Sequence, residues 1–154
     1  MIQRIQTLYL LIVVILGTLL CFFSPVQFLT PDATEYLYLQ AFDKWPLTVM
    51  TLAIPLLALV IIFLFKHRML QARLNIVNVV LCIGYYALLA LYIAYIVKGY
   101  EPLPTHNAQL STANCEWYLN VWAAIPLVNI VLTMMATRRI LKDEALVRAA
   151  DRLR

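Results

Sequence analysis

Side chains that could act as acids, nucleophiles or metal ligands are sparse in this chain and are kept apart. The two histidines, His67 and His106, fall in connecting segments that we place below on opposite sides of a membrane, so they cannot share a metal ion. The cysteines Cys21, Cys82 and Cys115 lack the Cys-x-x-Cys spacing of a dithiol redox site. Cys21 and Cys115 could meet on one side of the membrane, although free thiols are the favoured interpretation. We expect no catalytic residue, no metal site and no cofactor, and a non-enzymatic role is favoured.

Uncharged polar and aromatic side chains within the apolar part of the chain are the next candidates. Asn75 and Asn78 are spaced one helical turn apart near one end of an apolar run, where they could bind a lipid headgroup. Together with Tyr85 and Pro126 they could form a cleft for a lipid or a quinone within a helical bundle. Hydrogen bonding and aromatic packing between neighbouring helices explain the same residues. Both interpretations stay open.

Four apolar runs must position these side chains. Each run has about 20 residues, the length that crosses a bilayer core as a helix, and none contains Lys, Arg, Asp or Glu. The composition agrees, since 64% of the chain is hydrophobic and only 13% is charged. We predict an all-α integral membrane four-helix bundle that forms a single domain over residues 1–154. The predicted spans are Ile5–Phe23, Leu47–Phe65, Ile76–Val97 and Leu119–Ala136.

The distribution of basic residues predicts how the chain sits in the membrane. Of its 12 Lys and Arg residues, all but Lys44 and Lys98 lie in the N-terminal segment, the second linker and the C-terminal tail. Basic residues remain on the cytoplasmic side during insertion. We therefore expect a multi-pass protein of the bacterial inner membrane with both termini in the cytoplasm.

The connections between the spans carry weaker signals. In the first external loop, Thr30-Pro31-Asp32 is typical of a helix start, whereas Tyr36–Leu39 alternates like a strand. The second external loop, Lys98–Tyr118, contains glycine and prolines and is predicted to be irregular. The tail, Arg138–Arg154, has good helix formers and should continue the fourth helix.

A short repeat relates the second and fourth spans. Ala53-Ile54-Pro55-Leu56 matches Ala124-Ile125-Pro126-Leu127. This match suggests two duplicated helical hairpins, with Pro55 and Pro126 at equal depths inside their spans. A proline inside a helix removes one backbone hydrogen bond and favours a kink.

Three segments resemble a known family. They are Met1–Leu10, the linker Lys66–Arg73 and the ending Lys142–Arg154. They resemble the uncharacterised bacterial family known as domain of unknown function 4293, found in the Bacteroidetes. The resemblance covers essentially the whole chain and implies a four-span inner-membrane protein, but it supplies no activity, cofactor or catalytic residue. All three segments fall on the predicted cytoplasmic side.

Our first interpretation is therefore a scaffold or partner-binding protein that acts through its cytoplasmic face, and the rival is a lipid- or quinone-binding protein with an intramembrane cleft. Membrane lipids and a cytoplasmic or membrane protein are the expected partners, and no nucleic acid is expected. We also expect an acid of the tail, Asp143, Glu144 or Asp151, to pair with an arginine of the N-terminus or linker. The candidate interaction residues are Arg4, Arg68, Arg73, Arg148, Asp151 and Arg152.

Overall fold

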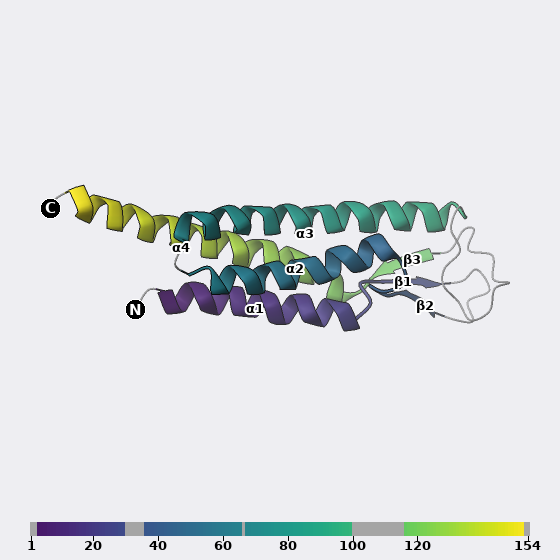
Figure 1. Ribbon diagram of the computed structural model, residues 1–154. Coiled ribbons are helices and arrows are strands. Elements are labelled where there is room, and N and C mark those ends of the chain that lie inside the picture. Colours follow the sequence, from purple (N-terminus) through teal and green to yellow (C-terminus); the bar gives the residue numbers. More distant parts are fainter. Residues whose placement is uncertain (1–2, 30–35, 66, 100–115, 153–154) are drawn as a thin grey trace.

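The computed structural model describes residues 3–29, 36–65, 67–99 and 116–152 (Figure 1). In this part of the chain four long helices and three short strands form, and the strands gather at one end. The helices are α1 (Gln3–Phe22), α2 (Trp45–Phe63), α3 (Arg68–Val97) and α4 (Ile125–Arg152), with a short 3-10 helix, η1 (Val121–Ala124), before α4. The strands are β1 (Val26–Leu29), β2 (Tyr36–Leu39) and β3 (Glu116–Leu119).

The four helices form an antiparallel bundle, as the sequence predicted. α1 packs against α2 and α4, and α3 packs against the same two helices. All four are long and apolar enough to cross a membrane, and at most 39% of any apolar window is buried inside the protein. Many of the remaining apolar side chains are exposed on the outside of the bundle, as expected for helices that face lipid. Exposed Leu56 and Val80 are examples.

Two helix boundaries differ from the predicted spans. α3 begins at Arg68, about two turns before the predicted start at Ile76. The intervening residues are good helix formers. Their charges keep them out of the bilayer core, but charged residues form helices readily. α4 begins at Ile125 rather than at Leu119, because β3 and η1 take the residues before it. α4 then continues to Arg152, which confirms the helical tail.

The two prolines of the repeat occupy different positions. Pro55 lies inside α2, where its ring packs against α1 at Gly17. Pro126 is the second residue of α4, where its missing N–H removes no helical hydrogen bond. Pro126 thus lies within the fourth apolar span, Val121–Val147, as expected, but its place in the first turn of α4 means that the expected loss of a helical hydrogen bond is wrong for this proline. The repeated residues serve two different structural roles and give the duplication no support.

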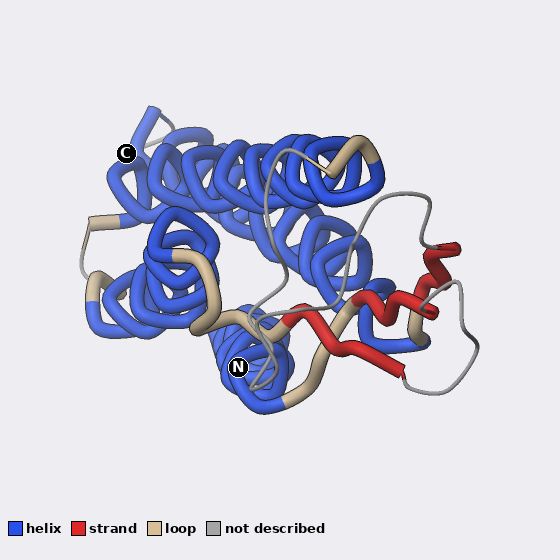
Figure 2. Tube along the Cα trace, turned by 90° about the vertical axis from the view of Figure 1, so that its right-hand side faces the viewer, coloured by secondary structure: helices blue, strands red, loops and turns tan. Residues whose placement is uncertain are grey.

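A three-stranded antiparallel sheet lies to one side at one end of the bundle, which we call the sheet end (Figure 2). The strand order is β2-β1-β3, and Phe28 of β1 stands between Leu37 of β2 and Trp117 of β3. Val26 and Phe28 are fully buried and pack into the same core cluster as Leu47 and Ile96. Buried side chains of β1 thus anchor the sheet to the helices.

The sheet confirms the strand expected in the first loop and corrects the described part of the prediction for the second, of which residues 100–115 lie outside the described residues. Tyr36–Leu39 is a strand, as its alternation indicated, while Thr30-Pro31-Asp32 lies outside the described residues. Glu116–Leu119 is also a strand rather than an irregular segment. This strand pairs with β1, which is remote in the sequence, so no local sequence pattern predicted the strand.

Candidate functional site

The end of the bundle opposite the sheet gathers three segments: the start of α1, the connection between α2 and α3, and the C-terminal part of α4 (Figure 1). We call this the basic end. Gln6 of α1 donates a hydrogen bond from Nε2 to Oδ2 of Asp143 of α4, 2.5 Å away. The α2–α3 connection is short because Leu64 closes α2 and its carbonyl accepts a hydrogen bond from the His67 amide at 3.0 Å. At the basic end these contacts join α1 to α4 and α2 to α3.

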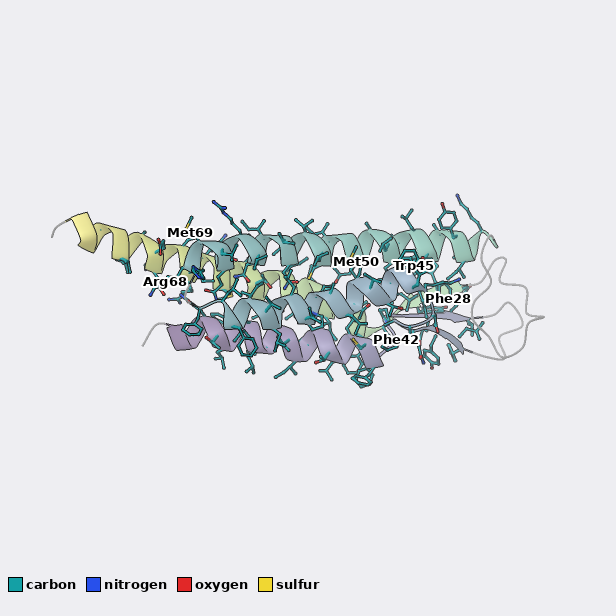
Figure 3. All side chains as sticks on the ribbon, viewed as in Figure 1. Phe28, Phe42, Trp45, Met50, Arg68 and Met69 are labelled. Atoms are coloured by element: carbon teal, nitrogen blue, oxygen red, sulfur yellow. The ribbon has the colours of Figure 1, made fainter. Side chains whose placement is uncertain are left out.

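A groove of ≈ 730 Å³ lies at the basic end, between the start of α3 and the tail of α4. Arg68 and Met69, which contribute to it, lie beside the α4 tail in Figure 3. Arg68 is half-buried, whereas Arg73 is exposed. The groove residues are His67, Arg68, Met69, Leu70 and Arg73 from the first wall and Glu144 and Val147 from the second.

The groove combines guanidinium groups with apolar surface and one carboxylate. Glu144 is the one acid among the described residues that line it, and it shares the groove with Arg68 and Arg73. The ion pair expected between the tail and the linker stays a prediction, since Asp143 bonds instead to the amide of Gln6. An Arg side chain can engage a carboxylate or a phosphate with two hydrogen bonds. The groove therefore has the chemistry to bind an anion.

The other sequence-predicted members of this surface fall outside the described side chains. The backbone of Arg4 belongs to α1 and that of Arg148, Asp151 and Arg152 to α4. The structure thus places all four on the elements that form the basic end. Their side chains are not among those that the structure describes.

Inside the bundle, polar side chains meet along the contact between α3 and α4. Asn75, Asn78 and Tyr85 lie on one face of α3 and are fully buried, and Asn129 and Thr133 on α4 are fully buried as well. Among the described residues, none donates to or accepts from the side-chain polar atoms of these five. We call this set the polar seam. Sequence reasoning singled out the three α3 residues but not the two on α4, whose i, i+4 spacing was the available signal.

Pro126 is buried at the Tyr85 end of the polar seam. It begins α4 at the level of Tyr86, whose hydroxyl donates to the Ala123 carbonyl at 2.6 Å and accepts from the Leu127 amide at 3.0 Å. Asn78 lies about 12 Å further along α3. Tyr85 and Pro126 therefore lie at about the same level, with Asn75 and Asn78 further toward the basic end, and the cleft predicted from these four residues stays a prediction.

A second groove, of ≈ 610 Å³, lies nearer the sheet end and is almost entirely apolar. It runs between α3 and the segment formed by β3, η1 and the start of α4. The side chains along it include Tyr86, Ile93, Trp117, Val121 and Leu127. No sequence pattern indicated this groove, because its two walls come from distant parts of the chain.

Ionisable groups at the sheet end make local contacts. Burial raises the pKa of the Asp43 carboxyl. A hydrogen bond from the Gln40 amide and the positive charge of Lys44 lower this pKa and offset part of the increase. The Tyr118 hydroxyl donates to Glu116 at 2.7 Å, and this bond to the carboxylate raises the pKa of the phenol. Both contacts join residues that are close in sequence, and Tyr36 also raises the pKa of Tyr118, by less than Glu116 does.

Thiols and metal-ligating groups are dispersed in the described part of the chain. Cys21 and Cys82 are free, and Cys115 lies outside the described residues. No group of three His, Cys, Asp or Glu side chains in residues 3–29, 36–65, 67–99 and 116–152 is arranged to hold a metal ion. The described geometry directs attention to the groove and the polar seam.

Comparison with known proteins gives one match. A family described as Domain of unknown function (DUF4293) matches residues 2–153. No curated protein and no solved structure matches the chain.

Proposed function

We propose that this chain, which belongs to the family described as Domain of unknown function (DUF4293), is an integral inner-membrane protein that binds anionic phospholipid headgroups. The headgroups bind in the groove at the basic end, which we call the basic groove. In this proposal both termini and the groove face the cytoplasm. The protein performs no chemistry on the lipid and acts by holding it at the surface where its three basic segments converge.

The observation that carries the proposal is the composition of the groove. Arg68 and Arg73 stand at the start of α3, just before its apolar part, so their guanidinium groups belong at the boundary between headgroups and acyl chains. Met69, Leu70 and Val147 add apolar surface beside them. A phospholipid presents this same pairing, a phosphate directly above an apolar chain.

The size and surroundings of the groove agree with a lipid headgroup. Its ≈ 730 Å³ falls within the usual range of small-molecule sites. Arg138, Arg139 and Lys142 add positive charge on the exposed surface of α4. The cytoplasmic leaflet is rich in anionic lipid, and basic pockets between helices on this side bind such headgroups.

Glu144 makes the groove selective for a phosphate headgroup over other negatively charged surfaces. A carboxylate beside two guanidinium groups lowers the net positive charge, so diffuse attraction to an anionic surface is weakened. Binding then depends on the hydrogen bonds that the planar guanidinium groups make to phosphate oxygens. This distinguishes a lipid site from a general basic patch.

The test compares two double variants that lose the same charge. The full chain is purified in neutral detergent, and binding of phosphatidylglycerol and of phosphatidylcholine is followed by native mass spectrometry. We expect Arg68→Gln with Arg73→Gln to weaken phosphatidylglycerol binding about tenfold, equivalent to about 1.4 kcal/mol. Arg138→Gln with Arg139→Gln, outside the groove, should change it little.

Two results would contradict this function. Equal losses in both double variants would mean that only diffuse charge attracts the lipid. Undiminished phosphatidylglycerol binding in the groove variant would exclude a lipid headgroup site and leave an acidic protein segment as the partner of the groove.

A second candidate function, binding of a lipid chain or a quinone, is favoured by the apolar groove. This groove offers ≈ 610 Å³ of almost purely apolar surface beside the hydroxyl of Tyr86. Solvent extraction of the purified protein followed by mass spectrometry tests it. A stoichiometric quinone or lipid that is lost when Ala90→Trp fills the groove would support this candidate, and extracts without one would exclude it.

A further inference from the structure

The polar seam places five fully buried polar side chains in the interior of an otherwise apolar bundle. Asn75, Asn78 and Tyr85 come from α3, and Asn129 and Thr133 come from α4. Eight polar atoms of these side chains have no hydrogen-bond partner among the described residues. A buried polar group without a partner costs roughly 1–3 kcal/mol. A set of this size therefore indicates a bound molecule that supplies the missing hydrogen bonds.

The contacts between helices place these residues opposite one another. The Tyr86 hydroxyl bonds to Ala123 and Leu127, which sets α3 against α4 around Ile125. The two helices run antiparallel with the same rise per residue. Moving eight residues along each, from Tyr86 to Asn78 and from Ile125 to Thr133, brings Asn78 and Thr133 to one level.

The other two helices complete this level with small apolar side chains. Leu10 of α1, Ile61 of α2 and Ala136 of α4 pack together. One turn nearer the sheet end, α1 and α2 present Val13 and Ala58 at the level of Thr133 of α4. All three of these residues are fully buried. The layer around Asn78 thus has two apolar walls from α1 and α2 and two polar walls from α3 and α4. A molecule bound there meets polar groups from one direction only.

The kinds of polar atom in the seam identify the chemistry of the ligand. An asparagine amide both donates and accepts, as do the hydroxyls of Thr133 and Tyr85. An anion would use only the donors and a cation only the acceptors, and the seam contains no charged side chain to balance either. The matching ligand is uncharged and both donates and accepts hydrogen bonds.

We propose that the polar seam is a binding site for water in the interior of the bundle. Gln71 and Thr137 continue the buried polar side chains toward the basic end, which gives water its direction of access. Toward the sheet end the interior is closed by the apolar cluster that contains Leu89, Ile96 and Phe28. The site is therefore a blind hydrated pocket, and it does not depend on the lipid function proposed for the basic groove.

Solid-state NMR of the full chain in lipid bilayers tests this site directly. Magnetisation is transferred from water protons to the side-chain amides of ¹⁵N-labelled asparagine, and each signal is assigned by its loss in a single Asn→Ala variant. We expect Asn75, Asn78 and Asn129 to receive water magnetisation at mixing times that leave the methyl groups of Leu47 and Ile54 in the apolar core unaffected. Transfer to the three amides no faster than to those methyl groups would overturn the proposal.

A substitution gives a second readout. Asn78→Leu replaces the amide and the water bonded to it by an apolar side chain of similar size that needs no partner, so we expect slower water transfer to Asn75 and Asn129 and no loss of thermal stability. If the seam asparagines instead bond directly to one another, Asn78→Leu lowers the unfolding temperature and the wild-type amides are dry. That pair of results would contradict the hydrated site.

Discussion

The hydroxyl of Tyr86 joins α3 to the start of α4 by accepting a hydrogen bond from the amide of Leu127 at 3.0 Å. It also donates to the carbonyl of Ala123 at 2.6 Å. The first turn of a helix leaves its amides without intrahelical partners, and Pro126 cannot donate. Tyr86 therefore supplies a cap from a neighbouring helix, and it sets the level at which the two halves of the polar seam meet.

Removal of this hydroxyl should destabilise the bundle. We expect Tyr86→Phe to lower the free energy of unfolding by about 1 kcal/mol, because two backbone groups lose their partner. Tyr92→Phe, on the same helix, is the matched control and should have a smaller effect. Denaturant unfolding in mixed micelles measures both, and equal losses would show that the Tyr86 bonds add nothing specific.

Gly17 permits the close contact between α1 and α2. A Cβ atom at this position would lie 3.0 Å from the Cβ of Pro55, whereas a Cβ at Gly84 of α3 would meet nothing within 4 Å. We expect Gly17→Ala to destabilise the protein, since the ring of Pro55 is held in α2. Gly84→Ala should be neutral or stabilising by about 0.5–1 kcal/mol, the usual gain in a helix. Thermal unfolding of the two variants in one detergent compares them, and a Gly17→Ala protein as stable as Gly84→Ala would contradict the contact.

The tail of α4 should be tethered to the start of α1. In a background with the native cysteines replaced by serine, Gln6→Cys with Asp143→Cys is expected to be bridged by a short bifunctional methanethiosulfonate reagent, because the native side chains are in hydrogen-bond contact. Gln6→Cys with Lys142→Cys is the control, since Lys142 is exposed on α4. Gel mobility without reductant reads both out. Equal yields from the two pairs would indicate a tail that moves freely.

The basic asymmetry of the sequence predicts the orientation in the membrane. A reporter enzyme that is active only outside the cytoplasm should be inactive when fused after Arg154 and active when inserted next to Lys98. The reversed pattern would place the basic groove outside the cell interior and remove the proposed access to cytoplasmic-leaflet lipid.

The helices were predictable from the sequence because the length and apolar composition of each run are enough to predict a membrane-spanning helix. Phe63 and Val97, for example, end helices within two residues of the predicted ends. Boundaries that depend on partners were missed: Leu119 is apolar enough for a span, but it pairs with Val26 in the sheet. Pro126 resembled Pro55 by its neighbours in sequence, and only the start of α4 made it a first-turn residue.

The candidate site divides along the same line. Arg68 and Arg73 were identified as basic residues of the predicted cytoplasmic linker that resembles the family, and the structure brings them to one groove with Glu144. The seam residues Asn129 and Thr133 were not selected, because single polar residues in apolar runs usually bond between helices. Their significance depends on facing Asn78 across α3 and α4, a relationship that exists only after the helices have packed.

The pairing of β1 with β3 has a mechanical consequence. β1 belongs to the connection between α1 and α2, and β3 belongs to the connection between α3 and α4, so the two helical hairpins are fastened together at the sheet end. Any relative movement of the two hairpins must then be a rotation about the sheet end. Its amplitude grows with distance from the pivot, and it is largest where Gln6 meets Asp143.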